Sequence, residues 1–333
     1  MSTKTTIIPV ASGKGGVGKT LFAANLAIAL ARRGHETVAV DMDLGGSNLY
    51  TYLGVPNNTS GIGDFLKAGD TAFEDLAVNT GIDNLRFIPG DGRTPFMANI
   101  SYEQRNRLIE KIRGIDARYV VLDLGAGTVF NTLNFFGLAY RGIIVTTFET
   151  PAVMNFIMFL RSFIFRVITG IVRENERALD IVVKAFSRSI RTEPLTVDSL
   201  IAMIAEVDQG LADKARRACN YYRPRIVYNM GDHPDELSVT NRIDNALRQG
   251  LSMETDHFGF VFFDDTVRMS AKNREVLVTR YPKSVAAQGI SRIAARLEKT
   301  WDYADPDSAR RLLASTNKEY EAWRAPRENR RRA

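Results

Sequence analysis

Short apolar runs rich in β-branched residues alternate along this chain with longer runs of helical spacing. The runs at 119–123 (YVVLD) and 142–147 (GIIVTT) are apolar almost throughout, which is typical of strands covered on both faces. Residues 21–31, 101–113 and 284–300 have the composition and spacing of helices. Further strands are predicted at 5–11, 36–41, 85–88, 224–229 and 257–263. This alternation predicts an α/β fold: a doubly wound, mostly parallel sheet flanked by helices in three α/β/α layers.

A glycine-rich segment joins the first predicted strand to the first predicted helix. Residues 12–20 read SGKGGVGKT and contain the pattern G-x-x-x-x-G-K-[ST]. In a strand, turn and helix of this kind, backbone N–H groups and the positive helix end surround one phosphate, and glycine lets the backbone come close. Glycine-rich turns also occur as plain loops, but this pattern in this context is specific. The predicted phosphate contacts are Gly13, Gly15, Gly16, Val17 and Gly18.

The two residues that end this segment carry the chemistry of a phosphate and metal site. The Lys19 ammonium is predicted to neutralise the β- and γ-phosphates of a nucleotide, and the Thr20 hydroxyl to bind Mg²⁺. ATP or ADP with Mg²⁺ is therefore the expected ligand. Lys14 is a second lysine in the loop, one that an ordinary phosphate-binding loop does not need.

Acidic residues follow two of the predicted strands. Because ligands of an open parallel sheet lie beyond the carboxyl ends of its strands, Asp41, Asp43 and Asp123 are expected to converge near the phosphates. Asp123 suits a carboxylate that orients Mg²⁺ through water. Asp43, on the loop with Gly45 and Gly46, suits a group that assists the metal and positions the attacking water. The alternative for each aspartate is a helix cap or a turn.

Composition narrows the class of protein. The 333 residues are 45% hydrophobic and 25% charged, an ordinary balance for a globular protein. The single cysteine, Cys219, excludes an intramolecular disulfide framework and argues against a cysteine-ligated metal or iron–sulfur site within one chain. No secretion signal begins the sequence, so the cytoplasm is expected. We expect one domain over residues 1–301, followed by a loose, helical, basic extension at 302–333.

The formal net charge of +6 is concentrated at the end of the chain. Residues 324–332 hold five arginines and one glutamate. Such a segment can hold DNA or an anionic membrane by neutralising charge, although it can equally be a solvated tail. Residues 305–324 have only a thin apolar stripe, which argues against stable membrane anchoring by this extension.

Three segments together resemble the deviant Walker A ATPases, the MinD/ParA superfamily. They are residues 14–20 (KGGVGKT), 40–49 (VDMDLGGSNL) and 121–128 (VLDLGAGT). The stretches GGSNL and DLGAGT are most similar to the FlhG (FleN) type of MinD-like protein. The resemblance extends from about residue 5 to about residue 299.

The resemblance implies a slow ATPase that cycles between a monomer and an ATP-bridged homodimer. Lys14 would reach across the dimer to the partner's phosphates, Asp43 would serve hydrolysis, Asp123 would be the Walker B acid, and Asn229 would read adenine. A protein partner would stimulate hydrolysis or be recruited. The family role is to set the place or number of a structure such as a flagellum, pole, division site or chromosome, on a membrane, nucleoid or cell pole.

Residues 153–172 form a long apolar segment interrupted by Asn155, Arg161 and Arg166. Two arginines near its middle argue against a helix that crosses a membrane. The remaining interpretations are a helix that covers one face of the sheet, a partner or dimer interface, and contact with a lipid surface.

Enzymes and carriers of the same fold are the alternative to a positioning switch. An iron–sulfur carrier would need a cysteine pair, and a capsule tyrosine kinase would show a tyrosine-rich tail, where this chain has Tyr303 and Tyr320. An ATP-dependent synthetase is compatible with the composition. It would form a product from a small substrate without a macromolecular activator.

Overall fold

The computed structural model describes residues 4–67, 72–90, 100–187 and 196–332, with side chains described as far as Arg324 at the C-terminal end. In these residues the strands form one sheet in the order β3-β4-β2-β5-β1-β6-β7-β8. Every neighbouring pair is parallel except β3 and β4. The strands are β1 (Thr6–Ala11), β2 (Thr37–Met42), β3 (Val78–Asn79), β4 (Leu85–Ile88), β5 (Tyr119–Leu124), β6 (Ile143–Thr146), β7 (Arg225–Gly231) and β8 (Asp256–Phe262).

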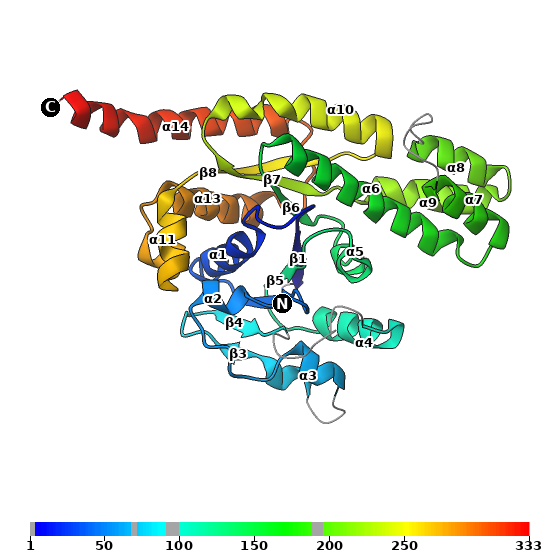
Figure 1. Ribbon diagram of the computed structural model, residues 1–333, viewed down its shortest axis with the longest axis horizontal. Coiled ribbons are helices and arrows are strands. Elements are labelled where there is room, and N and C mark those ends of the chain that lie inside the picture. The colour runs from blue at the N-terminus through cyan, green and yellow to red at the C-terminus, as the bar shows by residue number, and fades with distance from the viewer. Residues whose placement is uncertain (1–3, 68–71, 91–99, 188–195, 333) are drawn as a thin grey trace.

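Helices cover both faces of this sheet (Figure 1). One layer contains α1 and α13 with α2, α11 and α12; the other contains α4, α5 and α6, with α7, α8 and α9 packed beyond α6 and α10 beside it. The helices are α1 (Lys19–Ala31), α2 (Leu49–Leu53), α3 (Ile62–Lys67), α4 (Tyr102–Arg113), α5 (Phe130–Phe136), α6 (Thr150–Val172), α7 (Glu176–Ser187), α8 (Val197–Ala205), α9 (Gln209–Tyr221), α10 (Thr240–Leu251), α11 (Asp265–Asn273), α12 (Leu277–Arg280), α13 (Val285–Thr300) and α14 (Ser308–Arg332), with 3-10 turns η1 (Phe73–Leu76) and η2 (Pro234–Val239).

The predicted α/β fold is confirmed, and each predicted strand and helix matches an observed element within two residues at either end. Ser101 and Ser284, which were placed inside helices, are the N-caps of α4 and α13. Their hydroxyls accept hydrogen bonds from backbone N–H groups of the first turn, which is the ordinary way a serine begins a helix. The short antiparallel strand β3 and helices α2, α3, α5, α10, α11 and α12 were not predicted.

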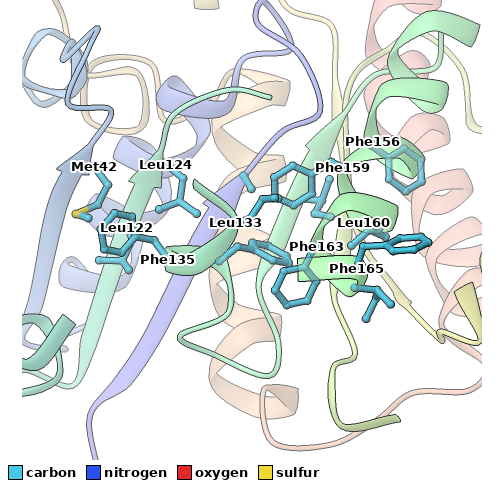
Figure 2. Packing of buried hydrophobic residues seen from close by; sticks show 14 of the residues in the cluster. Met42, Leu122, Leu124, Leu133, Phe135, Phe156, Phe159, Leu160, Phe163 and Phe165 are labelled. Atoms are coloured by element: carbon cyan, nitrogen blue, oxygen red, sulfur yellow. The ribbon is translucent and has the colours of Figure 1, made fainter. Parts of the chain in front are cut away.

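The apolar segment at 153–172 lies within α6, which covers one face of the sheet. Among the described residues, α6 is the helix whose length and apolar composition would suffice to cross a membrane. It instead packs against β6, α5, α7 and α9. Phe159 and Phe163 lie among the buried apolar side chains of this face (Figure 2). Both make edge-to-face contacts with Phe136 of α5 at 5.1 Å between ring centroids. The interpretation of a core helix is therefore confirmed for this face of α6.

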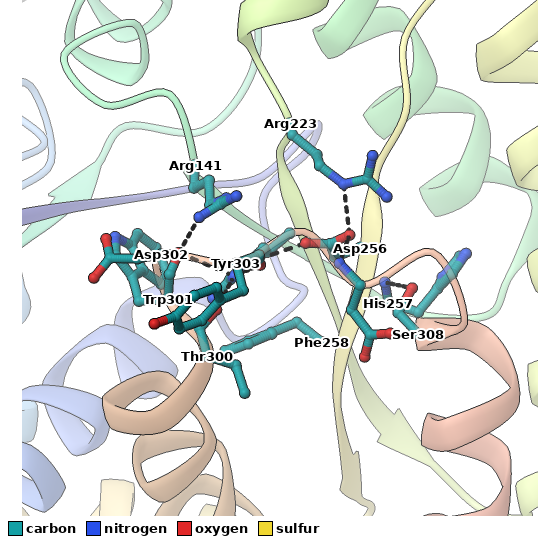
Figure 3. Close-up of polar contacts among 12 residues, drawn as sticks. Arg141, Arg223, Asp256, His257, Phe258, Thr300, Trp301, Asp302, Tyr303 and Ser308 are labelled. Carbon is teal, nitrogen blue, oxygen red and sulfur yellow. Dashed lines mark hydrogen bonds and ion pairs between the residues drawn. The ribbon is translucent and has the colours of Figure 1, made fainter.

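The turn between α13 and α14 is fixed by buried arginines (Figure 3). Arg225 is 1% exposed, and its Nη2 donates to the carbonyl oxygens of Thr300, Trp301 and Tyr303 at 2.7, 3.1 and 3.0 Å. Arg141 also donates to the Trp301 carbonyl. The chain after residue 301 is thus tied to the sheet before α14 begins.

Helix α14 then runs along β8, the edge strand, before it extends away from the body (Figure 1). Ser308 Oγ accepts a hydrogen bond from the backbone N–H of His257 at 3.0 Å, while Leu312 and Thr316 are buried. The extension is helical, but the expectation that it is loose is wrong for its first half, which covers a strand edge. The domain boundary at residue 301 stays a prediction. The side chains of the arginine-rich end, 325–333, lie outside the described residues.

Candidate nucleotide-binding site

The glycine-rich segment forms a tight turn between β1 and α1, at the carboxyl edge of the sheet. Gly18 has φ +81° and caps α1 in the left-handed region, where a side chain is strained. A Cβ on Gly18 would lie 2.3 Å from Asn229 Nδ2, and a Cβ on Gly13 would lie 2.3 Å from the backbone carbonyl of Asn155 in α6. Glycine is therefore required at these two positions by packing as well as by any ligand.

Lys19, Thr20 and Asp123 meet at the start of α1, as the sequence predicted. Lys19 Nζ lies 2.5 Å from Asp123 Oδ1 and 3.2 Å from Thr20 Oγ1. Lys19 is 7% exposed and Asp123 is fully buried. An ion pair so far out of water requires close geometry to offset the desolvation of both charges, and this contact supplies it.

Asp123 has the burial and the free carboxylate oxygen expected of a residue that helps to bind a metal ion. Burial raises the pKa of Asp123, and the adjacent Lys19 ammonium acts in the opposite direction. Its second oxygen, Oδ2, is buried and accepts no hydrogen bond from the described residues. Mg²⁺ is commonly bound by a few protein oxygens together with waters and substrate phosphates. The Thr20 hydroxyl and the unsatisfied Asp123 carboxylate fit that demand, so these residues would hold the ion beside a nucleotide, where it would offset phosphate charge.

Asp41 does not join this group, contrary to the expectation that all three aspartates converge on the phosphates. Asp41 is fully buried, and its carboxylate accepts hydrogen bonds from Ser47 Oγ at 2.7 Å, from Leu49 N at 3.0 Å and from Asp43 N at 3.1 Å. Burial, and then the charge of Asp123, raise the pKa of Asp41 to about 7. Its role is to fold the loop over residues 43–49, which is the turn alternative.

Asp43 is carried on that loop and faces the Asp123 segment. The Asp43 carboxylate lies beside Gly46 and Gly125, where an added Cβ on either glycine would come within 3.5 Å of Oδ1. Asp43 lines the cavity at the glycine-rich turn, together with Thr20 and Asn48. The structure therefore brings Asp43, Thr20 and Asp123 to one place, as predicted from the sequence.

Two glycine-rich loops are tied to each other by the backbone. The Gly127 N–H, in the segment after β5, donates to the Ser12 carbonyl at 3.0 Å, and Ser12 Oγ donates to the Lys14 carbonyl at 2.9 Å. A displacement of either loop would therefore shift the other. Such a link gives the β5–α5 segment a direct mechanical connection to the phosphate-binding turn.

Lys14 lies in the cavity wall with a partly exposed side chain. Glu149, the N-terminal boundary residue of α6, is near enough to be affected by its charge. The Thr147 hydroxyl and the backbone are the main causes that lower the pKa of Glu149, and Lys14 adds to them. Lys14 makes no direct ion pair among the described residues, and its ammonium remains available to a group outside this chain.

Asn229 lies at the end of β7 in a strand irregularity. The ladder between β7 and β8 shifts register between Asn229 and Gly231, and the intervening Met230 has φ +60°. This bulge directs the Asn229 amide toward the glycine-rich turn, where Nδ2 donates to the Val17 carbonyl at 2.8 Å. Asn229 lines the cavity, so the structure places it at the predicted site; its contact with adenine stays a prediction.

The cavity has a volume of about 610 Å³ and extends from the turn to the carboxyl end of β8. Several side chains of its wall were not predicted, among them Tyr52, Met230 and Arg268. The acidic turn after β8 was visible in the sequence as Asp264 and Asp265, and both line the cavity. Asp264 also accepts hydrogen bonds from Thr266 N and Ala286 N, so it holds α11 and α13 in position around the site.

This arrangement agrees with comparison to known proteins. The family model described as the CobQ/CobB/MinD/ParA nucleotide binding domain matches residues 8–278. The chain belongs to this family. For this MinD/ParA-type chain, a MinD structure from Pyrococcus horikoshii complexed with Mg-ADP superimposes with a TM-score of 0.58 at 20% identity, covering 89% of this chain and 96% of the other.

Two curated relatives indicate which branch of the family is similar. FleN of Pseudomonas aeruginosa, called an antiactivator, is 22% identical over 298 residues, which is 88% of this chain and 86% of FleN. The septum site-determining protein MinD of Synechocystis is 37% identical over 150 residues, or 45% of this chain and 56% of MinD. The chain spans about half the length of the MinD relatives it matches. The resemblance to the MinD/ParA superfamily, with FleN-like similarity, is confirmed.

Proposed function

We propose that this MinD/ParA-type chain is an ATP-binding, slowly ATP-hydrolysing dimerisation switch that sets the place or number of a cellular structure. The observation that carries the proposal is Lys14, whose ammonium lies in the cavity wall without an ion-pair partner among the described residues. Lys19 already serves the same loop through its contact with Asp123. A second cation beside the phosphates is explained when it acts on a nucleotide held by another subunit.

The remaining site residues supply the chemistry of phosphoryl transfer. ATP with Mg²⁺ fits the backbone N–H groups of Gly15 to Gly18, and Lys19 would leave Asp123 to pair with the phosphates. Bound Mg²⁺ would neutralise charge on the transferring phosphoryl group. Asp43, on a loop held by Asp41, would orient the attacking water. These roles rest on the positions of the side chains and on the family resemblance.

The surface beside the loop suits a second copy of the chain. Gly13 contacts the backbone of α6 at Asn155, and the neighbouring Met154 and Met158 are 55% and 39% exposed. Exposed methionines next to a ligand site favour an interface, because their removal from water stabilises the complex and their flexible side chains adapt to a partner. The proposed homodimer would therefore enclose both nucleotides between the two glycine-rich loops.

We propose that a macromolecule in the cytoplasm determines where in the cell the dimer binds. The relatives named MinD and FleN support a positioning or number-control role. A protein partner would recruit the dimer or stimulate hydrolysis, and the arginine-rich C-terminal end could add contact with DNA or an anionic membrane.

The test compares three variants by light scattering coupled to size-exclusion chromatography and by phosphate release. Lys14→Ala should remain monomeric with ATP, while Asp43→Ala should dimerise with ATP and lose hydrolysis by about a hundredfold or more. Lys299→Ala, an exposed lysine on α13, is the control and should match the wild type. Dimerisation of Lys14→Ala equal to that of the wild type would overturn the two-lysine proposal.

An ATP-dependent synthetase is the alternative favoured by one comparison. The family description includes CobQ and CobB, and a cobyrinic acid a,c-diamide synthase from Mycobacterium smegmatis, bound to ADP and magnesium, has a TM-score of 0.56 at 18% identity. A synthetase would release phosphate only with a small carboxylate substrate and would not need dimerisation by ATP. Substrate-dependent turnover by Lys14→Ala would favour this alternative.

A further inference from the structure

Two arginines on different helices converge on one phenylalanine ring away from the nucleotide cavity. The Arg166 guanidinium carbon, on α6, lies 4.2 Å from the Phe130 ring centroid at the start of α5. The guanidinium carbon of Arg105, on α4, lies 4.9 Å from the same centroid and 5.2 Å from that of Tyr102. Among the described residues, Arg166 Nε is buried without a hydrogen-bond partner, and neither arginine joins an ion pair.

Positive charges act on Arg166, and the nearby carboxylates of Glu103 and Glu110 on α4 and of Glu174, which pairs with Arg173, form no ion pair with Arg105 or Arg166 among the described residues. Burial lowers the pKa of Arg166, and the charges of Arg105 and Arg173 lower it further. Arg105 is 5% exposed, and burial lowers its pKa as well. Between residues 130 and 172, which include α5 and α6, the only carboxylate in the sequence is Glu149 at the far end of α6.

Such an arrangement is unfavourable for the folded chain by itself. Guanidinium groups stay ionised, and without a counter-ion the buried Arg105 and the partly buried Arg166 lose hydration that the cation–π contacts with Phe130 replace only in part. Buried arginines in proteins are ordinarily paired with carboxylates. Among the described residues no carboxylate pairs with either guanidinium group, so the two arginines can accept an anionic group from a partner.

We propose that Arg105, Arg166 and Phe130 form a docking site for an acidic segment of a partner protein. A carboxylate of that segment would accept hydrogen bonds from both guanidinium groups, which match its geometry. Tyr102 and Phe130 are 59% and 48% exposed and would pack against an apolar residue next to the carboxylate. We call this surface the arginine–phenylalanine site.

The arrangement favours a protein segment over a nucleic acid. Single-stranded nucleic acids stack their bases on open aromatic faces. At this site the guanidinium groups of Arg105 and Arg166 lie over the Phe130 ring, so base stacking there would first have to displace them. A carboxylate would approach the exposed edges of the guanidinium groups and leave their contacts with the Phe130 ring in place.

The site is also connected to the phosphate-binding turn. Phe130 opens α5 directly after the segment in which the Gly127 N–H donates to the Ser12 carbonyl. An occupant that holds Phe130 therefore restrains the loop next to the nucleotide cavity. The arginine–phenylalanine site stands on its own geometry, and its test does not depend on hydrolysis.

The experiment measures binding of a fluorescein-labelled peptide of glutamate and leucine residues by fluorescence anisotropy, without nucleotide. Arg105→Met and Arg166→Met should each weaken binding about tenfold or more, the amount expected when a charge-assisted hydrogen bond is lost. Arg161→Met is the matched control on α6, because Arg161 lies over Phe165 outside the site, and it should bind like the wild type. All variants keep the same C-terminal arginines, so their contribution cancels.

Thermal unfolding separates docking from a structural role. Removing an unpaired charge that is buried or partly buried should leave the melting temperature unchanged or higher, whereas a structural role predicts a fall that accompanies the loss of binding. Equal weakening by Arg161→Met, or displacement of the peptide by a single-stranded oligonucleotide with the same dependence on Arg105 and Arg166, would overturn the proposal. Loss of ATP-dependent dimerisation in Arg166→Met would also overturn it, because the surface would then belong to the dimer.

Discussion

At the scale of single residues, Gly18 is needed for the packing of the glycine-rich turn, and this requirement can be tested separately from its contact with a ligand. A Gly18→Ala change places a side chain at φ +81° and at 2.3 Å from Asn229 Nδ2. The left-handed backbone costs about 1–2 kcal/mol for alanine, and displacement of Asn229 loses its hydrogen bond to Val17, about 1 kcal/mol more. We expect the free energy of unfolding to fall by about 2–3 kcal/mol in urea titration, with loss of nucleotide binding.

Gly15→Ala is the matched control for this prediction. Gly15 has no atom within 4 Å of the position of an added Cβ, so the folded chain should accept alanine. Its free energy of unfolding should stay within about 0.5 kcal/mol of the wild type, while nucleotide affinity falls if the backbone approaches the phosphates. A Gly18→Ala protein as stable as Gly15→Ala would contradict the assignment of Gly18 as a packing position.

The residue scale also marks where sequence reasoning stops. Lys19, Thr20, Asp43 and Asp123 could be placed because each follows a strand or a turn whose end is visible in the sequence. Asp41 has the same local signal as Asp43, yet it lies inside β2, is fully buried and accepts three hydrogen bonds from the loop that follows. Which of two nearby aspartates faces a ligand depends on the direction of the strand end, and one sequence does not reveal it.

At the scale of elements, long apolar strands and helices with strong periodicity were predicted well. Helix α10 was missed because only Ile243, Leu247 and Leu251 mark its buried face among polar residues. The arginine–phenylalanine site was missed because its residues come from three helices, and only the packing of α4, α5 and α6 brings them together. Local patterns identify elements, whereas contacts between distant elements require the fold.

Arg225 is predicted to secure the connection between α13 and α14. Arg225→Met removes the donor for three backbone carbonyls and an ion pair with Asp256 Oδ2 at 3.7 Å, while Arg223 still pairs with Asp256. Burial lowers the pKa of Arg225 to about 10, which still leaves it charged at neutral pH. Loss of one partner in a buried ionic network typically costs about 3 kcal/mol or more, and we expect that decrease in the free energy of unfolding.

Arg33→Met is the comparison variant, because Arg33 also contacts α13 but does so at the surface of the protein. Arg33 pairs with Glu298 of α13 at 2.5 Å but is 40% exposed, and exposed ion pairs contribute about 1 kcal/mol or less. Urea titration of the two variants should therefore differ by about 2 kcal/mol. Similar losses in both would show that the carbonyl cluster around Arg225 does not hold the connection.

At the scale of the whole molecule, charge and nucleotide state are expected to act together. The sequence ends with five arginines in residues 324–332, and an ATP-bridged dimer would present two such ends. Each cation that neutralises a DNA phosphate contributes a slope of about −0.9 to the logarithm of affinity against the logarithm of salt concentration. Two tethered ends also bind one polyanion with avidity, which can raise affinity by about 10²-fold or more.

Binding of Asp43→Ala to duplex DNA and to anionic liposomes tests this combination, with ATP and with ADP. We expect ATP to strengthen binding to one of the two surfaces, and removal of residues 324–333 to weaken that binding and reduce the salt slope. Binding to DNA would support a ParA-like role on the nucleoid, and binding to liposomes would support a MinD-like role on a membrane. If the shortened chain binds as well as the full chain, the arginines are only solvated. Because the truncation leaves the glycine-rich loops intact, the shortened chain should still dimerise with ATP. That control distinguishes a loss of binding to DNA or liposomes from a loss of ATP-dependent dimerisation.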